Sequence, residues 1–263
     1  MSSPTPSERP RDFEGKVAIV TGGASGIARA TARLLAEQGA SVAVFDLNEQ
    51  AGAEVAAGLN QAGATASFHR CDVTSRTEVE RAIGAVLDRY DHIDVLANVV
   101  GGSDAEGGPQ PAWVYEMEES EWDAMIAMNL KSTFLCCRFV LPHMMSRRGG
   151  TIVNTSSGRA VIPAPQRAHY SAAKAGVIAL TLTLSIEAAP YGIRVNSVAP
   201  GATHTPRIRR GFTDEQWTAF LAKQPLGRIA EPEDTAEAIV FLAGPHSRHI
   251  NGQVLHVNGG APN

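Results

Sequence analysis

The sequence has little cysteine: three of its 263 residues, Cys71, Cys136 and Cys137. An odd number without a C-x-x-C pair argues against both a disulfide framework and a zinc site. Adjacent cysteines on a helix point about 100° apart, so Cys136 and Cys137 do not grip one ion together. We interpret all three as small buried hydrophobes, with a reactive thiol as the alternative. No metal and a reducing, cytoplasmic location are therefore expected.

Long apolar runs and excess positive charge are also missing. The cleanest apolar run, 238–243, falls far short of the roughly 18 residues of a membrane span. Lys and Arg number 23 against 27 Asp and Glu, a formal charge of −4, whereas nucleic-acid-binding domains are usually basic. Residues 1–12 are rich in Ser, Pro and charge and contain no apolar signal segment, so we expect a flexible tail. One domain, 13–263, should follow, with neither nucleic acid nor membrane as a partner.

Short β-rich runs alternate with longer helical patterns along this domain. Strands are expected at 16–20, 41–45, 66–69, 95–97, 151–155, 194–198 and 253–257. Helices are expected at 31–38, 50–60, 77–89, 119–145 (one or two), 170–189, 214–222 and 232–243, with 101–117 as a long loop. The alternation predicts an α/β doubly wound Rossmann fold of about seven parallel strands with helices on both faces. Ligands of such a sheet bind beyond the carboxyl ends of its strands.

A glycine-rich segment, TGGASGIA at 21–28, follows the first expected strand and opens a helix. Glycines let the backbone approach a pyrophosphate, and the helix N-terminus offers free N–H groups. Asp46 ends the second strand, 20 residues after Gly26. A carboxylate there accepts hydrogen bonds from ribose hydroxyls and repels a 2′-phosphate, which predicts NAD rather than NADP. Asp72, after the third strand, either accepts from an adenine amino group or caps the next helix.

Tyr170 and Lys174 lie four residues apart and therefore share one face of an expected helix. An ammonium nearby lowers the tyrosine pKa from its usual value of about 10, so the phenol can exchange a proton while hydride moves to or from a cofactor. Ser157, at the end of the fifth strand, can hydrogen-bond a substrate oxygen. Asn129 is a poor helix former inside the long helix, so it either faces solvent or breaks the helix locally and positions a water.

In this order and spacing, the residues resemble the short-chain dehydrogenase/reductase family over 14–260. The resemblance implies an oxidoreductase that interconverts a secondary alcohol and a ketone, with Tyr170 as acid/base. Lys174 would lower the pKa of Tyr170 and hold the nicotinamide ribose. Ser157 would polarise the substrate carbonyl, and Asn129 would hold a water in a proton relay. The implied cofactor contacts are Gly22, Ser25, Gly26, Ile27, Asp46, Leu47, Asp72, Val73, Asn98, Tyr170, Lys174, Pro200, Gly201, Thr203 and Thr205.

The sequence departs from the family pattern at two places. The third glycine of the turn is Ala28, where we expect slightly looser cofactor packing. The usual Asn-Asn-Ala-Gly after the fourth strand is Asn98-Val99-Val100-Gly101, so the two valines should reshape the wall near the cofactor.

The substrate is the least determined part of the prediction. Short segments at 100–102, 136–143 and 199–207 resemble dehydrogenases of cis-dihydrodiol carboxylates. The alternatives are a 3-oxoacyl-thioester, sugar, polyol or steroid enzyme, or a non-catalytic NAD-sensing scaffold. An inward-pointing arginine could pair with a substrate carboxylate; the candidates are Arg159, Arg207, Arg209 and Arg210. The resemblance also implies a homotetramer, or a dimer, built through the helices at 119–145 and 170–189 and the last strand.

Overall fold

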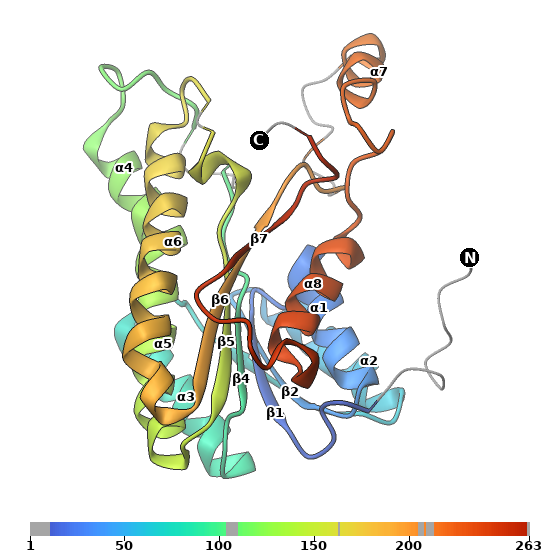
Figure 1. The fold of residues 1–263 in the computed structure, drawn as a ribbon, viewed down its shortest axis with the longest axis vertical. Coiled ribbons are helices and arrows are strands. Elements are labelled where there is room, and N and C mark those ends of the chain that lie inside the picture. Colours follow the sequence, from blue (N-terminus) through green and yellow to red (C-terminus); the bar gives the residue numbers. More distant parts are fainter. Residues whose placement is uncertain (1–10, 104–109, 163, 205–207, 209–212, 262–263) are drawn as a thin grey trace.

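The structure, a computed structural model, describes residues 11–103, 110–162, 164–204, 208 and 213–261. A parallel sheet of seven strands in the order β3-β2-β1-β4-β5-β6-β7 lies between two layers of helices (Figure 1). This confirms the predicted doubly wound α/β fold. The order reverses between β1 and β4, so the topological switch point lies where the glycine-rich turn leaves β1.

The elements follow the predicted alternation. The strands are β1 (Val17–Thr21), β2 (Ser41–Asp46), β3 (Thr65–Arg70), β4 (Val95–Asn98), β5 (Gly150–Thr155), β6 (Ile193–Pro200) and β7 (Val254–Val257). The helices are α1 (Gly26–Glu37), α2 (Glu49–Gln61), α3 (Arg76–Tyr90), α4 (Glu119–Ile126), α5 (Ser132–Arg147), α6 (Ala168–Ala188), α7 (Asp214–Leu221) and α8 (Pro232–Ala243). A π-helical turn, Ala127–Lys131, joins α4 to α5. Helix α1 starts five residues before the predicted 31, because it leaves the glycine-rich turn directly.

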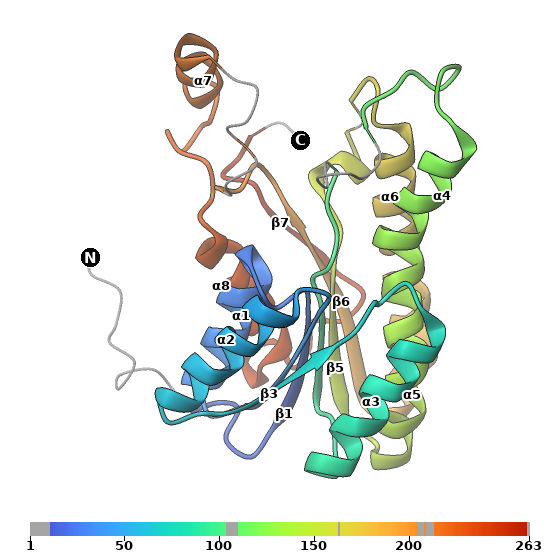
Figure 2. The same cartoon turned by 180° about the vertical axis from the view of Figure 1, so that it is seen from behind.

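Both faces of the sheet are covered, which explains why the central strands read as continuous apolar runs. Helices α1, α2 and α8 pack on one face, and α3, α5 and α6 pack on the other (Figure 2). All five residues of β1 are buried. Leu34 and Ile239 belong to the first layer's core, and Val79 and Val140 to the second's. Helix α7 and the segment before α4 rise beyond the carboxyl ends of the strands, at the top of Figure 1.

Two helical stretches, Glu119–Arg147 and Ala168–Tyr191, are long and apolar enough by length and composition to cross a membrane. In the fold they pack against the sheet, and 50% and 39% of their most apolar windows are buried. The exposed apolar side chains on them include Phe134, Leu182 and Ile186. These are the helices through which the resemblance implies contact with further copies of the chain.

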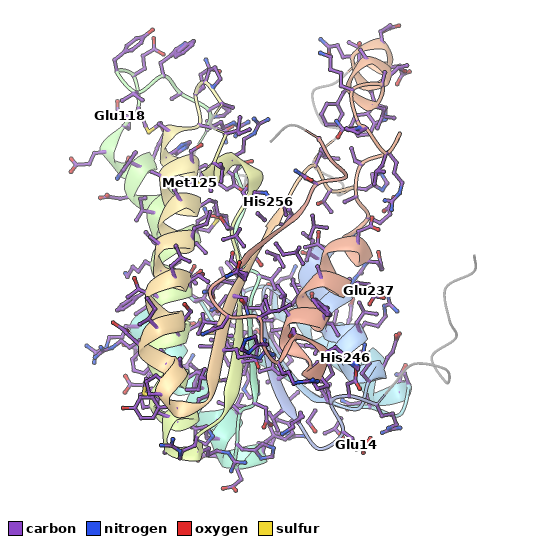
Figure 3. All side chains as sticks on the ribbon, viewed as in Figure 1. Glu14, Glu118, Met125, Glu237, His246 and His256 are labelled. Carbon is purple, nitrogen blue, oxygen red and sulfur yellow. The ribbon has the colours of Figure 1, made fainter. Side chains whose placement is uncertain are left out.

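The predicted tail falls mainly outside the described residues, which begin at Arg11. Oδ2 of Asp12 lies 3.0 Å from Nε2 of His246. Figure 3 labels His246, which follows α8. Phe13 is buried and belongs to the same core as α8. The domain therefore includes contacts made by the last residue assigned to the tail.

Candidate active site

The glycine-rich turn forms a cradle at the carboxyl end of β1. Gly22 has a φ of +74°, which favours glycine, and a Cβ there would lie 3.0 Å from Cγ2 of Val100. Val100 therefore lies against the glycine-rich turn, at the wall that the two valines after Asn98 were expected to reshape. Ser25 is the N-cap of α1, but its side chain makes no capping hydrogen bond. The first N–H groups of α1 thus remain available beyond the turn, as an anion site requires.

A carboxylate stands beside this cradle. Asp46 ends β2, and its Oδ2 accepts a hydrogen bond of 3.0 Å from the N–H of Ala24 in the turn. Its Oδ1 accepts one of 2.9 Å from the N–H of Asn48. Leu47, between them in the chain, is exposed. The turn thus holds a negative charge at the position where the sequence predicts contact with the adenosine ribose.

Asp72 does not cap the next helix, so that interpretation is wrong. Its Oδ1 accepts hydrogen bonds from the N–H and the hydroxyl of Thr74, at 2.9 and 2.7 Å. The N-cap of α3 is Ser75, whose hydroxyl accepts from the N–H of Glu78. Val73 is buried beside Asp72. Contact of Asp72 with an adenine stays a prediction.

Asn98 ties the middle of the sheet together. It is buried at the end of β4, in register with Asn154 of β5. Its Nδ2 donates to Oδ1 of Asn154 at 2.9 Å, and Nδ2 of Asn154 donates to the hydroxyl of Thr181 on α6 at 2.9 Å. The Asn98 side chain therefore joins β4 to β5, and contact of Asn98 with a cofactor stays a prediction.

Asn129 sits in the π-helical turn and is fully buried, so the solvent-facing interpretation is wrong and the local break in the helix is confirmed. Its Oδ1 accepts from the N–H of Gly102 at 3.0 Å, and its Nδ2 donates to the Gly102 carbonyl at 3.2 Å. Nδ2 also donates to the Met125 carbonyl at 3.1 Å. Figure 3 places Met125 at the upper part of the α4–α6 pair. Single π-turns inside helices occur often at functional sites, and this one fixes the segment after β4.

Lys174 is buried at the centre of the site, with 2% of its surface exposed. Its Nζ donates to the Thr155 carbonyl at 2.8 Å, and its own carbonyl accepts from the Ser156 hydroxyl at 2.8 Å. Burial lowers the pKa of Lys174 from its ordinary value to about 7. A Cβ on Gly101 would lie 2.7 Å from Nζ and 2.6 Å from Oδ1 of Asn129. A side chain at residue 101, just after β4, would therefore collide with both groups.

Tyr170 lies one turn before Lys174 on α6, and Nζ of Lys174 is 5.9 Å from the centroid of the Tyr170 ring. Ser157 follows β5 and is largely buried, and its Oγ accepts from the N–H of Arg159 at 3.2 Å. The structure thus gathers the four predicted catalytic residues at the carboxyl ends of β4 and β5. A hydroxyl, a phenol and a buried ammonium can together exchange a proton with an oxygen-bearing substrate.

The predicted segment after β6 is partly described. Gly201 donates its N–H to the Val257 carbonyl at 3.0 Å, and a Cβ there would lie 2.9 Å from Cα of Asn258. Thr203 is buried, and Pro200 is half-buried. Four other candidates lie outside the described residues, namely Thr205, Arg207, Arg209 and Arg210.

Sequence reasoning missed three backbone or hydroxyl partners: the Thr155 carbonyl, the Ser156 hydroxyl and the Gly102 peptide. The Thr-Ser-Ser run at 155–157 was a visible signal for the first two. His169, in the first turn of α6, is fully buried. Burial and the nearby Arg167 lower its pKa.

The cysteines agree with their interpretation as buried hydrophobes. All three are free and buried. Burial raises the pKa of Cys71 and of Cys137 to about 12, which opposes the reactive thiolate alternative. Among the residues that the structure describes, no group of three or more His, Cys, Asp or Glu side chains could hold a metal.

Known proteins resemble this chain along almost its whole length. A family model described as enoyl-(acyl carrier protein) reductase matches residues 22–262. The 3-oxoacyl-(acyl-carrier-protein) reductase FabG of Thermotoga maritima is 37% identical over 248 residues, which is 94% of this chain and 98% of the relative. The cis-4-hydroxycyclohexanecarboxylate dehydrogenase of Sinomonas cyclohexanicum is 40% identical over 248 residues, with 94% and 97% covered. The crystal structure of gox2181 matches with a TM-score of 0.88 at 32% identity, covering 95% of this chain and 96% of that one.

Proposed function

The chain belongs to the short-chain dehydrogenase/reductase family of oxidoreductases, and from this we propose that it is an NAD-dependent enzyme interconverting a secondary alcohol and a ketone. The observation that carries the proposal is the buried Lys174 ammonium, one helical turn from Tyr170 and 5.9 Å from its ring. Burial of a lysine side chain is energetically unfavourable, and packing of the core does not require it. A role in proton transfer with the adjacent phenol accounts for the burial of Lys174.

The nicotinamide cofactor, when bound, supplies the hydride acceptor or donor. Tyr170 takes the hydroxyl proton as hydride leaves an alcohol and returns it in the reverse direction. Lys174 in its protonated form favours the phenolate, and so lowers the pKa of Tyr170. The Ser157 hydroxyl donates to the substrate oxygen and holds it toward the phenol. Asn129 fixes the Gly102 peptide at the edge of the site, and a water in a proton relay is proposed beside it.

The residues present fit a dinucleotide. The Gly22 cradle and the uncapped first turn of α1 suit a pyrophosphate, because they combine close backbone approach with N–H donors. The Asp46 carboxylate, held by the N–H groups of Ala24 and Asn48, suits the ribose hydroxyls. It would repel a 2′-phosphate, which is why we propose NAD rather than NADP.

For the substrate we propose a small ring that bears the secondary alcohol and a carboxylate, such as a cis-dihydrodiol carboxylate. The relative from Sinomonas cyclohexanicum, whose name specifies a hydroxycyclohexanecarboxylate, supports this class. Arg159, which follows Ser157 closely and is exposed, is the described candidate for pairing with the carboxylate. The second candidate is a 3-oxoacyl thioester, which the name of the Thermotoga maritima relative favours.

The test is the absorbance of the reduced nicotinamide with purified protein. NAD and NADP are compared across ring hydroxycarboxylates, cis-dihydrodiol carboxylates, polyols, steroids and 3-hydroxyacyl thioesters, with the ketones run in reverse. NAD-linked turnover of ring carboxylates is expected. Turnover of thioesters alone would reject the substrate class, and NADP preference would reject the role given to Asp46. Binding of NAD without turnover on any substrate would favour the non-catalytic scaffold.

We also propose a homotetramer, or a dimer, in the cytoplasm. The exposed Phe134, Leu182 and Ile186 on α5 and α6 support association through these helices. The free, buried cysteines support a reducing compartment. Light scattering on the purified chain measures the number of copies.

A further inference from the structure

Arg70 and Asp46 are neighbours across the sheet. They are the last residues of β3 and β2 and are paired in register, and the N–H of Cys71 donates to the Asp46 carbonyl at 3.0 Å. Registered residues of adjacent parallel strands lie about 4.8 Å apart, with side chains leaving the same face of the sheet. Arg70 therefore lies next to Asp46, whose carboxylate we propose to contact the adenosine ribose. A nearby arginine is the group that accommodates a 2′-phosphate in dinucleotide sites.

The Arg70 guanidinium is held by Glu78 of α3. Its Nη1 lies 3.1 Å from Oε2 of Glu78, with the two side chains 50% and 27% exposed. The same Oε2 accepts from the N–H of Asp72 at 3.0 Å. The hydroxyl of Ser75, the N-cap of α3, accepts a hydrogen bond from the N–H of Glu78. This bond fixes the start of the helix that carries the Glu78 carboxylate. Glu78 therefore directs Arg70 over the strand end toward α3 and compensates its charge.

We propose that Glu78 is a specificity-determining residue for the cofactor. Because Glu78 pairs with Arg70, the Arg70 guanidinium does not pair with a 2′-phosphate. The 2′-phosphate of NADP is then repelled by the Asp46 carboxylate, and no cation compensates for this repulsion. The inference rests on the proposed dinucleotide site and adds a second carboxylate to it. Asp46 acts on the phosphate directly, whereas Glu78 acts through Arg70.

The structural role of Glu78 can be separated from this one. Its bond to the N–H of Asp72 shapes the turn at the predicted adenine end, which NAD and NADP share. A glutamine in its place keeps an oxygen that can accept from that N–H but loses the charge that pairs with Arg70. Weakened adenine contacts would change the affinity for both nucleotides equally. The ratio of the two affinities reports only on the 2′-phosphate.

The experiment is calorimetric titration of the cofactor-free protein with ADP-ribose and with 2′-phospho-ADP-ribose. The wild type should prefer ADP-ribose. In Glu78→Gln the preference should fall about three- to tenfold, the range expected when a partly exposed cation is freed for a phosphate. In Glu78→Gln combined with Arg70→Gln the preference should return to within twofold of the wild-type value.

Two matched controls test the identity of the cation and the effect of net charge. Arg81 also approaches Glu78, with Nη2 at 3.9 Å from Oε2; combining Glu78→Gln with Arg81→Gln should leave the shift in place. Glu80→Gln removes the same charge from an exposed position of α3 and should not change the preference by more than twofold.

Three results would overturn the inference while leaving the cofactor proposal standing: an unchanged preference in Glu78→Gln, an equal shift in Glu80→Gln, or a shift that survives Arg70→Gln. If the wild type binds neither compound, the proposed dinucleotide site fails, and this inference fails with it.

Discussion

Nζ of Lys174 donates a hydrogen bond of 2.8 Å to the carbonyl oxygen of Thr155, and so the buried ammonium of α6 is fixed to the last residue of β5. The neighbouring Ser156 hydroxyl donates back to the Lys174 carbonyl at 2.8 Å. These two reciprocal bonds join the helix that bears Tyr170 to the strand that leads to Ser157. The relative position of α6 and the end of β5 is therefore set by two hydrogen bonds from side chains to backbone carbonyls.

Lys174 should make stability depend on pH. Its pKa is lowered to about 7 in the fold and is 10.5 ordinarily, so between these values the unfolded chain binds a proton that the folded protein lacks. The free energy of unfolding should therefore rise with pH in this window, by at most about 1.4 kcal/mol per unit. Chemical denaturation of the cofactor-free wild type and Lys174→Met at pH 7, 8 and 9 measures the difference. Parallel curves would contradict it, and Lys223→Met, at an exposed position, should parallel the wild type.

Replacement of Tyr170 by Phe should abolish proton transfer and leave the fold intact. We expect kcat to fall about 10²- to 10⁴-fold, the usual contribution of a positioned acid/base group. Binding of ADP-ribose, which lacks the nicotinamide, should stay within about twofold of wild type by calorimetry. Activity near the wild-type level would remove Tyr170 from its proposed role.

Gly101→Ala should damage the site sharply. The new Cβ would meet Oδ1 of Asn129 at 2.6 Å and Nζ of Lys174 at 2.7 Å, at a φ of +147°. We expect a loss of about 1–3 kcal/mol in the free energy of unfolding and most of the activity. Thermal denaturation and steady-state rates measure both effects. Gly84→Ala is the matched control, because it lies in α3 with nothing within 4 Å of the new Cβ, and it should be neutral or slightly stabilising.

Asn129→Leu should loosen the segment after β4. It removes the hydrogen bonds to both backbone groups of Gly102 and leaves those groups without their side-chain partner. The expected cost is about 1–3 kcal/mol of stability, with faster amide exchange at Gly102 and Ser103. Hydrogen-exchange mass spectrometry would detect the change. Unaltered protection there would show that Asn129 does not hold the segment.

The sequence predicted the fold well because its signals were local. The alternation of apolar runs with helical patterns predicted the seven strands of the sheet, and the 21–28 turn predicted the edge at which a ligand would bind. The π-helical turn at Asn129 was harder, because its cause is the tertiary contact with Gly102 rather than any propensity of the surrounding residues. Asp72 was ambiguous, because Asp72 and Ser75 lie three residues apart and both are residue types that can cap the following helix. The cap proved to be Ser75.

The pairing of Arg70 with Glu78 was invisible in sequence for a different reason. The two residues belong to different elements, and only the register of β3 against β2 places Arg70 beside Asp46. The burial of Lys174 could not be predicted for the same reason, because it depends on how α6 packs against other elements, β4 and β5. The spacing of Tyr170 and Lys174 within one helix predicts that they share a face. It does not predict how deeply the Lys174 side chain is buried.

The strand order carries a consequence for how the protein is made. The turn after β1 and the segment after β6 both lie at the carboxyl-terminal edge of the parallel sheet, with β4 and β5 between the two strands. β4 fits between β1 and β5, so its neighbours on both sides must be present before the Gly101 segment has its place. A chain that ends before residue 168 contains the glycine-rich turn but lacks α6, which bears Tyr170 and Lys174. The proposed cofactor cradle and the proposed proton-transfer residues are therefore present together only after α6 has been synthesised.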